Sequence, residues 1–162
     1  MKKNLFIVLI LTFFSYPSFV WGADIQKGHA AVQKGDFAAA LREWKPLAEQ
    51  GNATAQYNLG LMYRKGDGVT QDYKTAVKWY RLSAEQGLAV AQRQLGLMYG
   101  IGNGGVIKDN IYAHMWINIS ALNGYKNADK LREYIAKKMT SADISTAQRL
   151  ARECVEKKYK GC

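Results

Sequence analysis

Apolar residues after Asp72 recur three or four positions apart, which is the period of an amphipathic α-helix. Asp72 belongs to the residue types that cap helix N-termini, and Gly87 to those that end helices. The spacing therefore predicts two helices joined near Gly87, a helical hairpin. The apolar positions are Tyr73, Ala76, Tyr80 and Ala84 in the first helix and Ala91, Leu95, Met98 and Tyr99 in the second.

The hairpin pattern occurs in more than one copy. The segments AEQGNATAQYNLGLMY (48–63) and AEQGLAVAQRQLGLMY (84–99) agree at 12 of 16 positions, 36 residues apart. Repetition at a period of about 20 to 50 residues indicates a repeat architecture, in which each unit buries its apolar face against its neighbours. Proline is absent after Pro46, and Ala, Leu, Lys, Gln and Glu are abundant, which favours helix over strand.

Weaker copies flank these two. Residues 36–51 share with 72–87 the Asp, an Ala and the final Ala-Glu-Gln-Gly, and residues 109–124 keep Asp, Ala, Trp, Ser, Ala and Gly. Before them, GHAAVQKG (28–35) supplies half a hairpin. Terminal units of such arrays are expected to be atypical, because one face meets water instead of a neighbour.

Two amphipathic helices are predicted after the repeats. The first runs from about Asn127 to Met139. The second starts at Thr140, where TSAD forms a weak capping box because its last residue is Asp rather than Glu or Gln.

Gly60 and Gly96 stand in the middle of predicted helices at the same place in each copy. Glycine inside a helix lowers stability by about 1 kcal/mol relative to alanine. Because both copies keep the glycine despite this loss, we expect it to have the same structural role in each. We expect close approach of the helix backbone to large aromatic residues of the partner helix, Trp79 and Tyr80 in one unit and Trp116 in the other.

The string A-x-A-Q-Y-N-L-G-L-M-Y-x-x-G-x-G-V-x-Q-D-Y-x-x-A-x-x-W-Y-x-x-S-A-E-Q-G from Ala53 to Gly87 resembles the Sel-1-like repeat, a relative of the tetratricopeptide repeat with a longer linking loop. The tail AKKMTSADISTAQRLARE is similar to the closing helices of small exported members. The resemblance implies an all-α fold, a short right-handed α-solenoid of helical hairpins. Its units would be repeats at about 53–88 and 89–124, a degenerate unit at 27–52 and capping helices at 125–162.

The first 22 residues have the pattern of an export signal. Lys2 and Lys3 precede the apolar run Leu5–Phe14, and a cleavage site is expected between Gly22 and Ala23. An uncleaved anchor is the alternative, but a run of ten apolar residues is short of the roughly 20 that span a membrane. We therefore expect one periplasmic or secreted domain, 23–162, without stable membrane insertion after cleavage.

The chain is basic, with 23 Lys and Arg against 13 Asp and Glu and a net charge of +10, which becomes +8 once Lys2 and Lys3 are removed. Such a balance attracts anionic partners, nucleic acid among them. Export and the scatter of the basic residues argue against nucleic acid. Acidic envelope polymers, anionic lipid head groups and acidic protein faces remain as candidates.

Cys154 and Cys162 are the two cysteines of the chain, and the expected oxidising compartment favours a disulfide between them. Unbroken helix would separate their α-carbons by about 12 Å, beyond the roughly 7 Å that a disulfide tolerates. The helix must therefore end between them, and Gly161 must help the chain double back. A bridge between two chains is the alternative. Lys157 stands where a cysteine-rich branch of the family has its turn glycine.

Residue patterns for catalysis or metal binding are sparse. His29 and His114 belong to no metal-binding spacing, and the loop DGVTQD lacks the alternating oxygen ligands of a calcium site. The cysteine-rich branch has been connected with penicillin binding and hydrolysis, but the chain contains no Ser-x-x-Lys motif. We predict no cofactor, no metal and no enzymatic activity. A cell-wall or β-lactam binding or hydrolysing protein remains the alternative function.

The resemblance implies that a concave face holds another protein. The residues that would do so vary between copies and face away from the core; their alternative role is an ordinary solvated face or packing between units. The aromatic residues Tyr63, Trp79, Tyr80, Tyr99 and Trp116 are interpreted as core. We predict a monomeric, non-enzymatic exported scaffold that serves assembly or regulation of an envelope complex. Its candidate partner-binding residues are Tyr57, Asn58, Leu61, Arg64, Arg93, Gln94 and Leu97.

Overall fold

The computed structural model describes residues 18–162 and the side chains from Ile25 onward, so the apolar run Leu5–Phe14 lies outside the described residues. Within that range it contains eight helices and no strand, which confirms the all-α solenoid. The helices are α1 Ser18–Gln33, α2 Phe37–Glu49, α3 Ala53–Lys65, α4 Tyr73–Ala84, α5 Ala89–Ile101, α6 Asn110–Leu122, α7 Ala128–Ala136 and α8 Ser141–Glu156.

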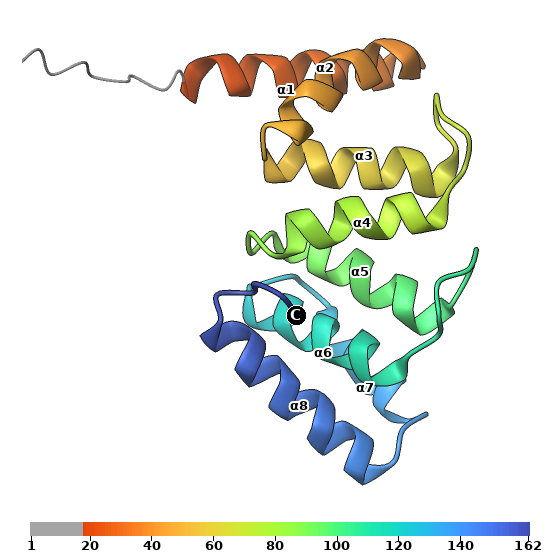
Figure 1. Cartoon of the computed structure of the whole chain (residues 1–162), viewed down its shortest axis with the longest axis vertical. Helices are drawn as coiled ribbons and strands as arrows, with labels where there is room; N and C mark the ends of the chain where they lie inside the picture. Colours follow the sequence, from red (N-terminus) through yellow and green to blue (C-terminus); the bar gives the residue numbers. More distant parts are fainter. Residues whose placement is uncertain (1–17) are drawn as a thin grey trace, which may run out of the picture.

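The helices form a stack of hairpins in chain order (Figure 1). The pairs α1/α2, α3/α4 and α5/α6 make the hairpins, and α2 and α4 pack against the first helix of the next unit. Both α7 and α8 pack against α6, so α8 closes the end of the stack instead of continuing the repeat. The long loops after α3 and α5 lie on one side of the stack, and the short turns after α2 and α4 lie on the other.

Side-chain caps set where the helices begin. The Asp72 carboxylate accepts from the backbone of Lys74 and Thr75 at the start of α4, as the sequence predicts. The capping box at α8 is confirmed, because the Thr140 hydroxyl accepts from the Asp143 backbone (3.1 Å) and the Asp143 carboxylate accepts from the Thr140 backbone (3.2 Å). Polar capping residues therefore determine where α4 and α8 begin.

A buried glutamine ties each unit to the one before it. The Gln56 side chain donates to the carbonyl of Ala48, and the Gln92 side chain donates to the carbonyl of Ala84, both at 3.1 Å. Each bond joins an odd-numbered helix to the C-terminal turn of the preceding even-numbered helix. A buried amide without such partners would be destabilising, so the repeated Ala-Glu-Gln-Gly and Ala-Gln have a structural cause.

A buried serine ties the two helices of each complete hairpin together. The Ser83 hydroxyl on α4 donates to the carbonyl of Ala53 at the start of α3 (2.8 Å). The Ser120 hydroxyl on α6 donates to the carbonyl of Ala89 at the start of α5 (2.7 Å). These bonds satisfy the buried serine hydroxyls, and they hold the second helix at a fixed height along the first.

Gly60 lets the backbone of α3 contact the ring of Tyr80, as predicted. A Cβ atom at Gly60 would lie 2.5 Å from Cδ1 and Cε1 of that ring, far inside van der Waals contact. The Trp79 side chain is not among the nearest neighbours of this position. Of the two predicted aromatic residues, Tyr80 makes the close contact with Gly60.

The predicted contact between Gly96 and Trp116 is wrong. A Cβ at Gly96 would instead lie 2.8 Å from Cγ1 of Ile117 and 3.0 Å from the carbonyl oxygen of Ala113. The loop before α6 has eight residues where the loop before α4 has seven. That extra residue moves α6 by one position relative to α5, so Ile117, not Trp116, is the structural equivalent of Tyr80.

A third glycine occupies the same position in the N-terminal hairpin. A Cβ at Gly28 on α1 would collide with the indole of Trp44 on α2. Gly28 lies 32 residues before Gly60 rather than 36, because the loop after α1 has three residues and the loop after α3 has seven. The degenerate unit thus repeats the contact that organises the other two.

The C-terminal cysteines lie within one chain at disulfide distance, with Cα atoms 5.6 Å apart. Helix α8 ends at Glu156, between them, as the geometric argument requires. Lys158 and Tyr159 adopt left-handed φ values of 51° and 67°, and Gly161 follows with 67°, so two non-glycine residues make most of the turn. The tail returns to the stack, where the Tyr159 hydroxyl donates to the side-chain oxygen of Asn123 (3.0 Å).

We predict that Gly60→Ala lowers the free energy of unfolding by about 1–3 kcal/mol, because the added methyl group overpacks the contact with Tyr80. Denaturant unfolding followed by circular dichroism measures it. The matched control is Gly100→Ala on α5, where a Cβ would lie an ordinary 3.5 Å from Ala113. Helix propensity should make that variant more stable by up to about 1 kcal/mol. Equal effects of the two substitutions would contradict the close-approach argument.

We also predict that replacing both cysteines by serine lowers the free energy of unfolding by about 2–3 kcal/mol, the loop-closure entropy expected for a ring of this length. Chemical denaturation measures the difference. Thiol titration of the denatured, unreduced wild-type protein should find no free sulfhydryl, whereas two free thiols per chain would rule out the internal pair.

Candidate partner-binding face

The residue that follows each close-approach glycine marks one face of the stack. His29, Leu61 and Leu97 follow Gly28, Gly60 and Gly96, so they hold equivalent positions on α1, α3 and α5. His29 and Leu61 line one pocket, and Leu97 lines another. We call the surface that carries these two pockets the odd-helix face, and its pocket walls come mainly from α1, α3, α5 and α7.

The N-terminal pocket lies between the first hairpin and α3 and has a volume of about 230 Å³. Three predicted binding residues line it: Tyr57, Asn58 and Leu61. The other wall residues come from α1, α2, the rest of α3 and the following loop; they are His29, Val32, Phe37, Trp44, Met62, Lys65 and Asp67.

The floor of the N-terminal pocket is held in place by the indole of Trp44. Its Nε1 donates to the carbonyl oxygen of Ile25 on α1 (3.2 Å). The imidazole of His29 packs edge-on against it, with ring centroids 5.2 Å apart and an interplanar angle of 70°. Because Trp44 is 4% exposed and held on two sides, its ring has a fixed place in the pocket wall.

Asn58 differs from the solvent-facing residue that the sequence analysis expects. Its side chain is 4% exposed, yet it lines the N-terminal pocket. The Nδ2 atom has no hydrogen-bond partner within the part of the chain that the structure describes. Asn58 is therefore a polar side chain in the pocket wall whose Nδ2 is buried without an acceptor.

Arg64 lies six residues further along α3, beside the hydroxyl of Tyr80. The Nε atom of Arg64 and the Oη atom of Tyr80 are both buried, without a hydrogen-bond partner among residues 25–162. Burial raises the pKa of the Tyr80 hydroxyl above its usual range, and the neighbouring Arg64 cation opposes that rise only in part. The hydroxyl stays protonated at neutral pH and remains available as a donor.

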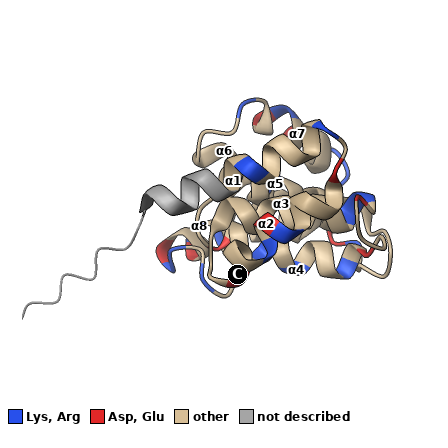
Figure 2. Cartoon of the chain, turned by 90° about the horizontal axis from the view of Figure 1, so that it is seen from above, with Lys and Arg blue, Asp and Glu red and all other residues tan. Residues whose placement is uncertain are grey.

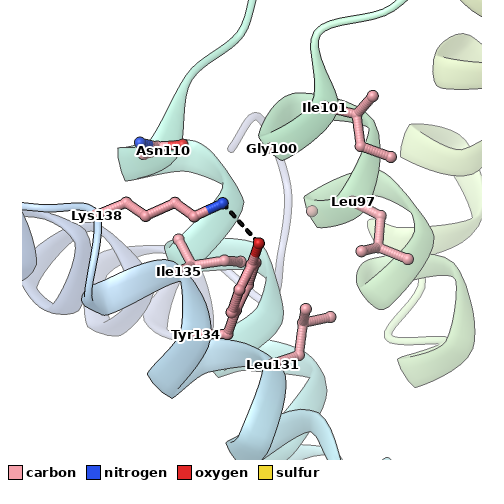
Figure 3. A pocket seen from close by; sticks show the side chains of 9 residues that line it. Leu97, Gly100, Ile101, Asn110, Leu131, Tyr134, Ile135 and Lys138 are labelled. Atoms are coloured by element: carbon pink, nitrogen blue, oxygen red, sulfur yellow. Dashed lines mark hydrogen bonds between the residues drawn. The ribbon is translucent and has the colours of Figure 1, made fainter.

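The C-terminal pocket lies between α5 and α7 and has a volume of about 180 Å³ (Figure 3). Leu97, Leu131 and Ile135 contribute apolar walls. At its rim the Lys138 ammonium donates to the hydroxyl of Tyr134 (2.8 Å), and this bond lowers the pKa of that hydroxyl. The remaining lining residues are Gly96, Gly100, Ile101 and Asn110.

Arg93 and Gln94 line neither pocket. The Arg93 guanidinium lies over the ring of Tyr125, 5.3 Å from its centroid, so it contacts the turn between α6 and α7. Gln94 is half-buried on α5. The structure thus brings Tyr57, Asn58 and Leu61 together, places Leu97 at the second pocket and sets the other three predicted residues apart.

The pocket walls that come from the terminal units are not predicted by the repeat pattern. Trp44 and Tyr134 belong to segments that match the repeat poorly, so comparison between copies could not identify them. The half-hairpin at 28–35 was the one available signal for the N-terminal pocket, because it implied a helix beside α3.

Charge does not concentrate on one side of the described structure. Basic and acidic segments alternate around the stack (Figure 2). Among the described residues no three of His, Cys, Asp and Glu lie together as a metal site would require, and no described helix has the length and apolar character needed to cross a membrane.

Comparison with known proteins identifies the repeat. The model of the Sel1 repeat matches residues 53–88 and 89–125. A protective antigen present in uropathogenic Escherichia coli strains, which displays an SLR fold, is 28% identical with a TM-score of 0.80, over 86% of this chain and 31% of that one. A Sel1 repeat protein from Oxalobacter formigenes is 29% identical with a TM-score of 0.63, over 71% and 34%. No curated protein matches the chain. The chain spans about a third of the length of these solved structures.

We predict that the protein loses stability in mild acid through His114 on α6. This side chain is 2% exposed, and its Nδ1 has no partner among the described residues. Burial, with a smaller contribution from Arg132, lowers the pKa of His114 below the usual 6.5. The unfolded chain therefore binds the proton first, and the free energy of unfolding should fall as pH drops below about 6.5.

Denaturant midpoints measured between pH 7.5 and 5 test this. His114→Phe should flatten the dependence in that range, while His29→Gln should keep it. An unchanged slope in the His114→Phe protein would assign the acid sensitivity to other groups.

Proposed function

We propose that this chain, which contains two Sel1 repeats, is a non-enzymatic adaptor that holds a partner protein or peptide on its odd-helix face. Sel1-repeat proteins generally mediate protein–protein interaction, and their fold is typically a non-catalytic scaffold. One observation carries the proposal: the equivalent residues Leu61 and Leu97 each line an open, largely apolar pocket. Apolar pockets with a few polar groups are the usual shape of binding sites.

Exposed apolar residues also support the odd-helix face as the surface that binds a partner. Ile101 and Tyr134 are each 57% exposed at the C-terminal pocket. Leaving such side chains in water is unfavourable, and clustering next to a pocket is typical of interaction surfaces. A partner that covers them would bury apolar area and gain the hydrophobic contribution to binding.

The composition of the pockets favours binding over hydrolysis. Neither pocket of the odd-helix face is lined by a serine. Acyl transfer to a β-lactam by the serine enzymes requires such a nucleophile with a base beside it. The pocket walls instead contain leucine, isoleucine and aromatic side chains, which bind apolar groups of complementary shape.

We infer that the protein works outside the cytoplasm, in assembly or regulation of an envelope complex. The export pattern of residues 1–22 supports this, as does the pairing of Cys154 with Cys162, since disulfides persist in oxidising compartments. Helix α1 starts at Ser18 and runs through the expected cleavage point. Cleavage after Gly22 would retain Ile25, whose carbonyl accepts the Trp44 bond.

We predict that Leu97→Asp weakens binding of a peptide selected on the full chain from a random phage-displayed library by at least tenfold, about 1.4 kcal/mol. A carboxylate in the wall of the C-terminal pocket is costly to desolvate against an apolar ligand. Fluorescence anisotropy with the synthetic peptide gives the dissociation constant.

The matched control is Leu122→Asp, because Leu122 is 67% exposed on α6 and lines neither pocket. It should leave the affinity unchanged. If Leu122→Asp weakened binding and Leu97→Asp did not, the binding surface would lie elsewhere.

A further inference from the structure

We propose that the C-terminal pocket selects an apolar side chain of the partner that has an acidic side chain beside it, and that the ammonium of Lys138 binds that carboxylate. The inference rests on the proposed function and names the chemistry that one end of the odd-helix face selects. It follows from three features of the described residues: an apolar pocket of side-chain size, a lysine held at its rim and the lack of an acid that compensates this lysine.

The size and walls of the pocket are the first feature. Leu97 on α5 and Leu131 and Ile135 on α7 form apolar walls, and Gly100 adds no side chain to the space between them (Figure 3). An apolar cavity of about 150 Å³ is enough to hold a benzene molecule, and this pocket has a volume of about 180 Å³. One apolar side chain of the size of leucine therefore fits.

The position of the Lys138 ammonium is the second feature. Its Nζ donates to the hydroxyl of Tyr134 (2.8 Å) and lies 4.1 Å from the centroid of the same ring. An ammonium has three donors, so two remain for a ligand after the bond to Tyr134. Because Tyr134 already holds the lysine side chain in place, a ligand carboxylate meets an ordered cation, and little side-chain entropy is lost on binding.

The lack of a compensating acid is the third feature. None of the described residues that line the pocket is acidic, and no carboxylate in the described part of the chain forms an ion pair with Lys138. Three acids lie next to or near the lining residues in the sequence. Asp109 accepts from the first turn of α6, Asp129 pairs with Arg132 (3.0 Å), and Glu133 is exposed and lines neither pocket. The cation at the rim is therefore available to a ligand.

The two pockets of the odd-helix face differ in this respect. Lys65 and Asp67 both line the N-terminal pocket and lie 3.9 Å apart at the closest pair of charged atoms, so an acidic ligand there would face Asp67. At the C-terminal pocket Lys108 adds to the positive charge, because it also lowers the pKa of the Tyr134 hydroxyl. The preference for an acidic side chain therefore belongs to the C-terminal pocket.

Two capped dipeptides of the same shape test the charge. Acetyl-Leu-Glu-amide carries the apolar side chain and a side-chain carboxylate, and acetyl-Leu-Gln-amide replaces that carboxylate by a neutral amide. Each is titrated into the full chain with ¹³C-labelled methyl groups, while the methyl resonances of Leu131 and Ile135 are followed by NMR. We expect the acidic dipeptide to bind about threefold more tightly at low ionic strength, the effect of an exposed ion pair. The preference should vanish at high salt.

Equal affinities of the two dipeptides at low ionic strength would overturn the proposal. Acetyl-Ala-Glu-amide, which has the carboxylate without the apolar side chain, should give no saturable shift. N-acetylleucine carries its carboxylate on the main chain instead. If it bound while acetyl-Leu-Glu-amide did not, the pocket would recognise a chain terminus, and the proposed acidic side chain would be wrong.

Lys138→Gln separates the charge from the pocket. It should make the two dipeptides bind equally without changing the affinity for acetyl-Leu-Gln-amide, and Lys138→Arg should keep the preference. The matched control is Lys137→Gln, which removes the same charge from an exposed neighbour that lines neither pocket. If Lys137→Gln abolished the preference as fully as Lys138→Gln, net charge would be its cause and the proposal would fail.

Gly100→Leu provides a variant that leaves Lys138 in place. Gly100 lines the pocket, and a Cβ there has an ordinary contact of 3.5 Å with Ala113, so the added side chain can be accommodated and occupies the pocket from α5. It should abolish binding of both dipeptides. Continued binding at wild-type affinity would show that they bind elsewhere and would overturn the proposal.

The selected peptides distinguish this inference from the function on which it rests. Peptides with neighbouring apolar and acidic residues that lose affinity on both Leu97→Asp and Lys138→Gln would support both proposals. Peptides that respond to Leu97→Asp but not to Lys138→Gln would overturn the acidic recognition and keep the adaptor. If selection yielded no peptide sensitive to either substitution, both proposals would fail.

Discussion

The close approach of paired helices at glycine is the constraint on which the rest of the structure depends. At Gly28, Gly60 and Gly96 the odd-numbered helix lies so near its partner that a single methyl group would collide with a side chain of that partner. This spacing fixes the height and rotation of each hairpin, and the Ser83 and Gln56 hydrogen bonds then reach their carbonyl acceptors. The row of residues that follows the glycines is thereby turned to one face. Helix packing and the placement of the pockets therefore have one cause.

The sequence predicted the repeat unit well, because its capping, period and glycines are local signals. These local signals predicted the contact of Gly60 with Tyr80 and the capping box at Thr140. The contact of Gly96 was not predicted correctly, because one extra loop residue shifts α6 against α5. Such a shift changes which side chain contacts the glycine, although the residues of the repeat itself stay the same. The glycine of α1 was missed for the converse reason, since a loop shorter by four residues placed it outside the expected period.

The candidate site was predictable only in the part that the repeats contribute. Comparison of the copies identified Tyr57, which Arg93 replaces in the second copy, and the pair Leu61 and Leu97, which is the same residue in both. The opposing walls come from α1, α2 and α7, which depart from the repeat at the two ends of the stack. Their departure has a physical origin, because a terminal unit has no further neighbour to pack against. Both pockets of the odd-helix face lie where the regular packing of the repeats gives way to these terminal units.

Hydrogen-bond satisfaction differs among the buried polar residues of this fold. Gln92 donates to Ala84 and accepts from Asn123, and Asn123 in turn accepts from Tyr159 of the disulfide-linked tail. This chain of bonds runs from the C-terminus into the core with every buried partner used, so it stabilises the stack and offers nothing to a ligand. The amide of Asn58 has the opposite character, because it is buried at a pocket wall with its donor unused. Buried atoms of Arg64, Tyr80 and His114 also lack a partner, so a missing hydrogen bond does not by itself mark a recognition residue.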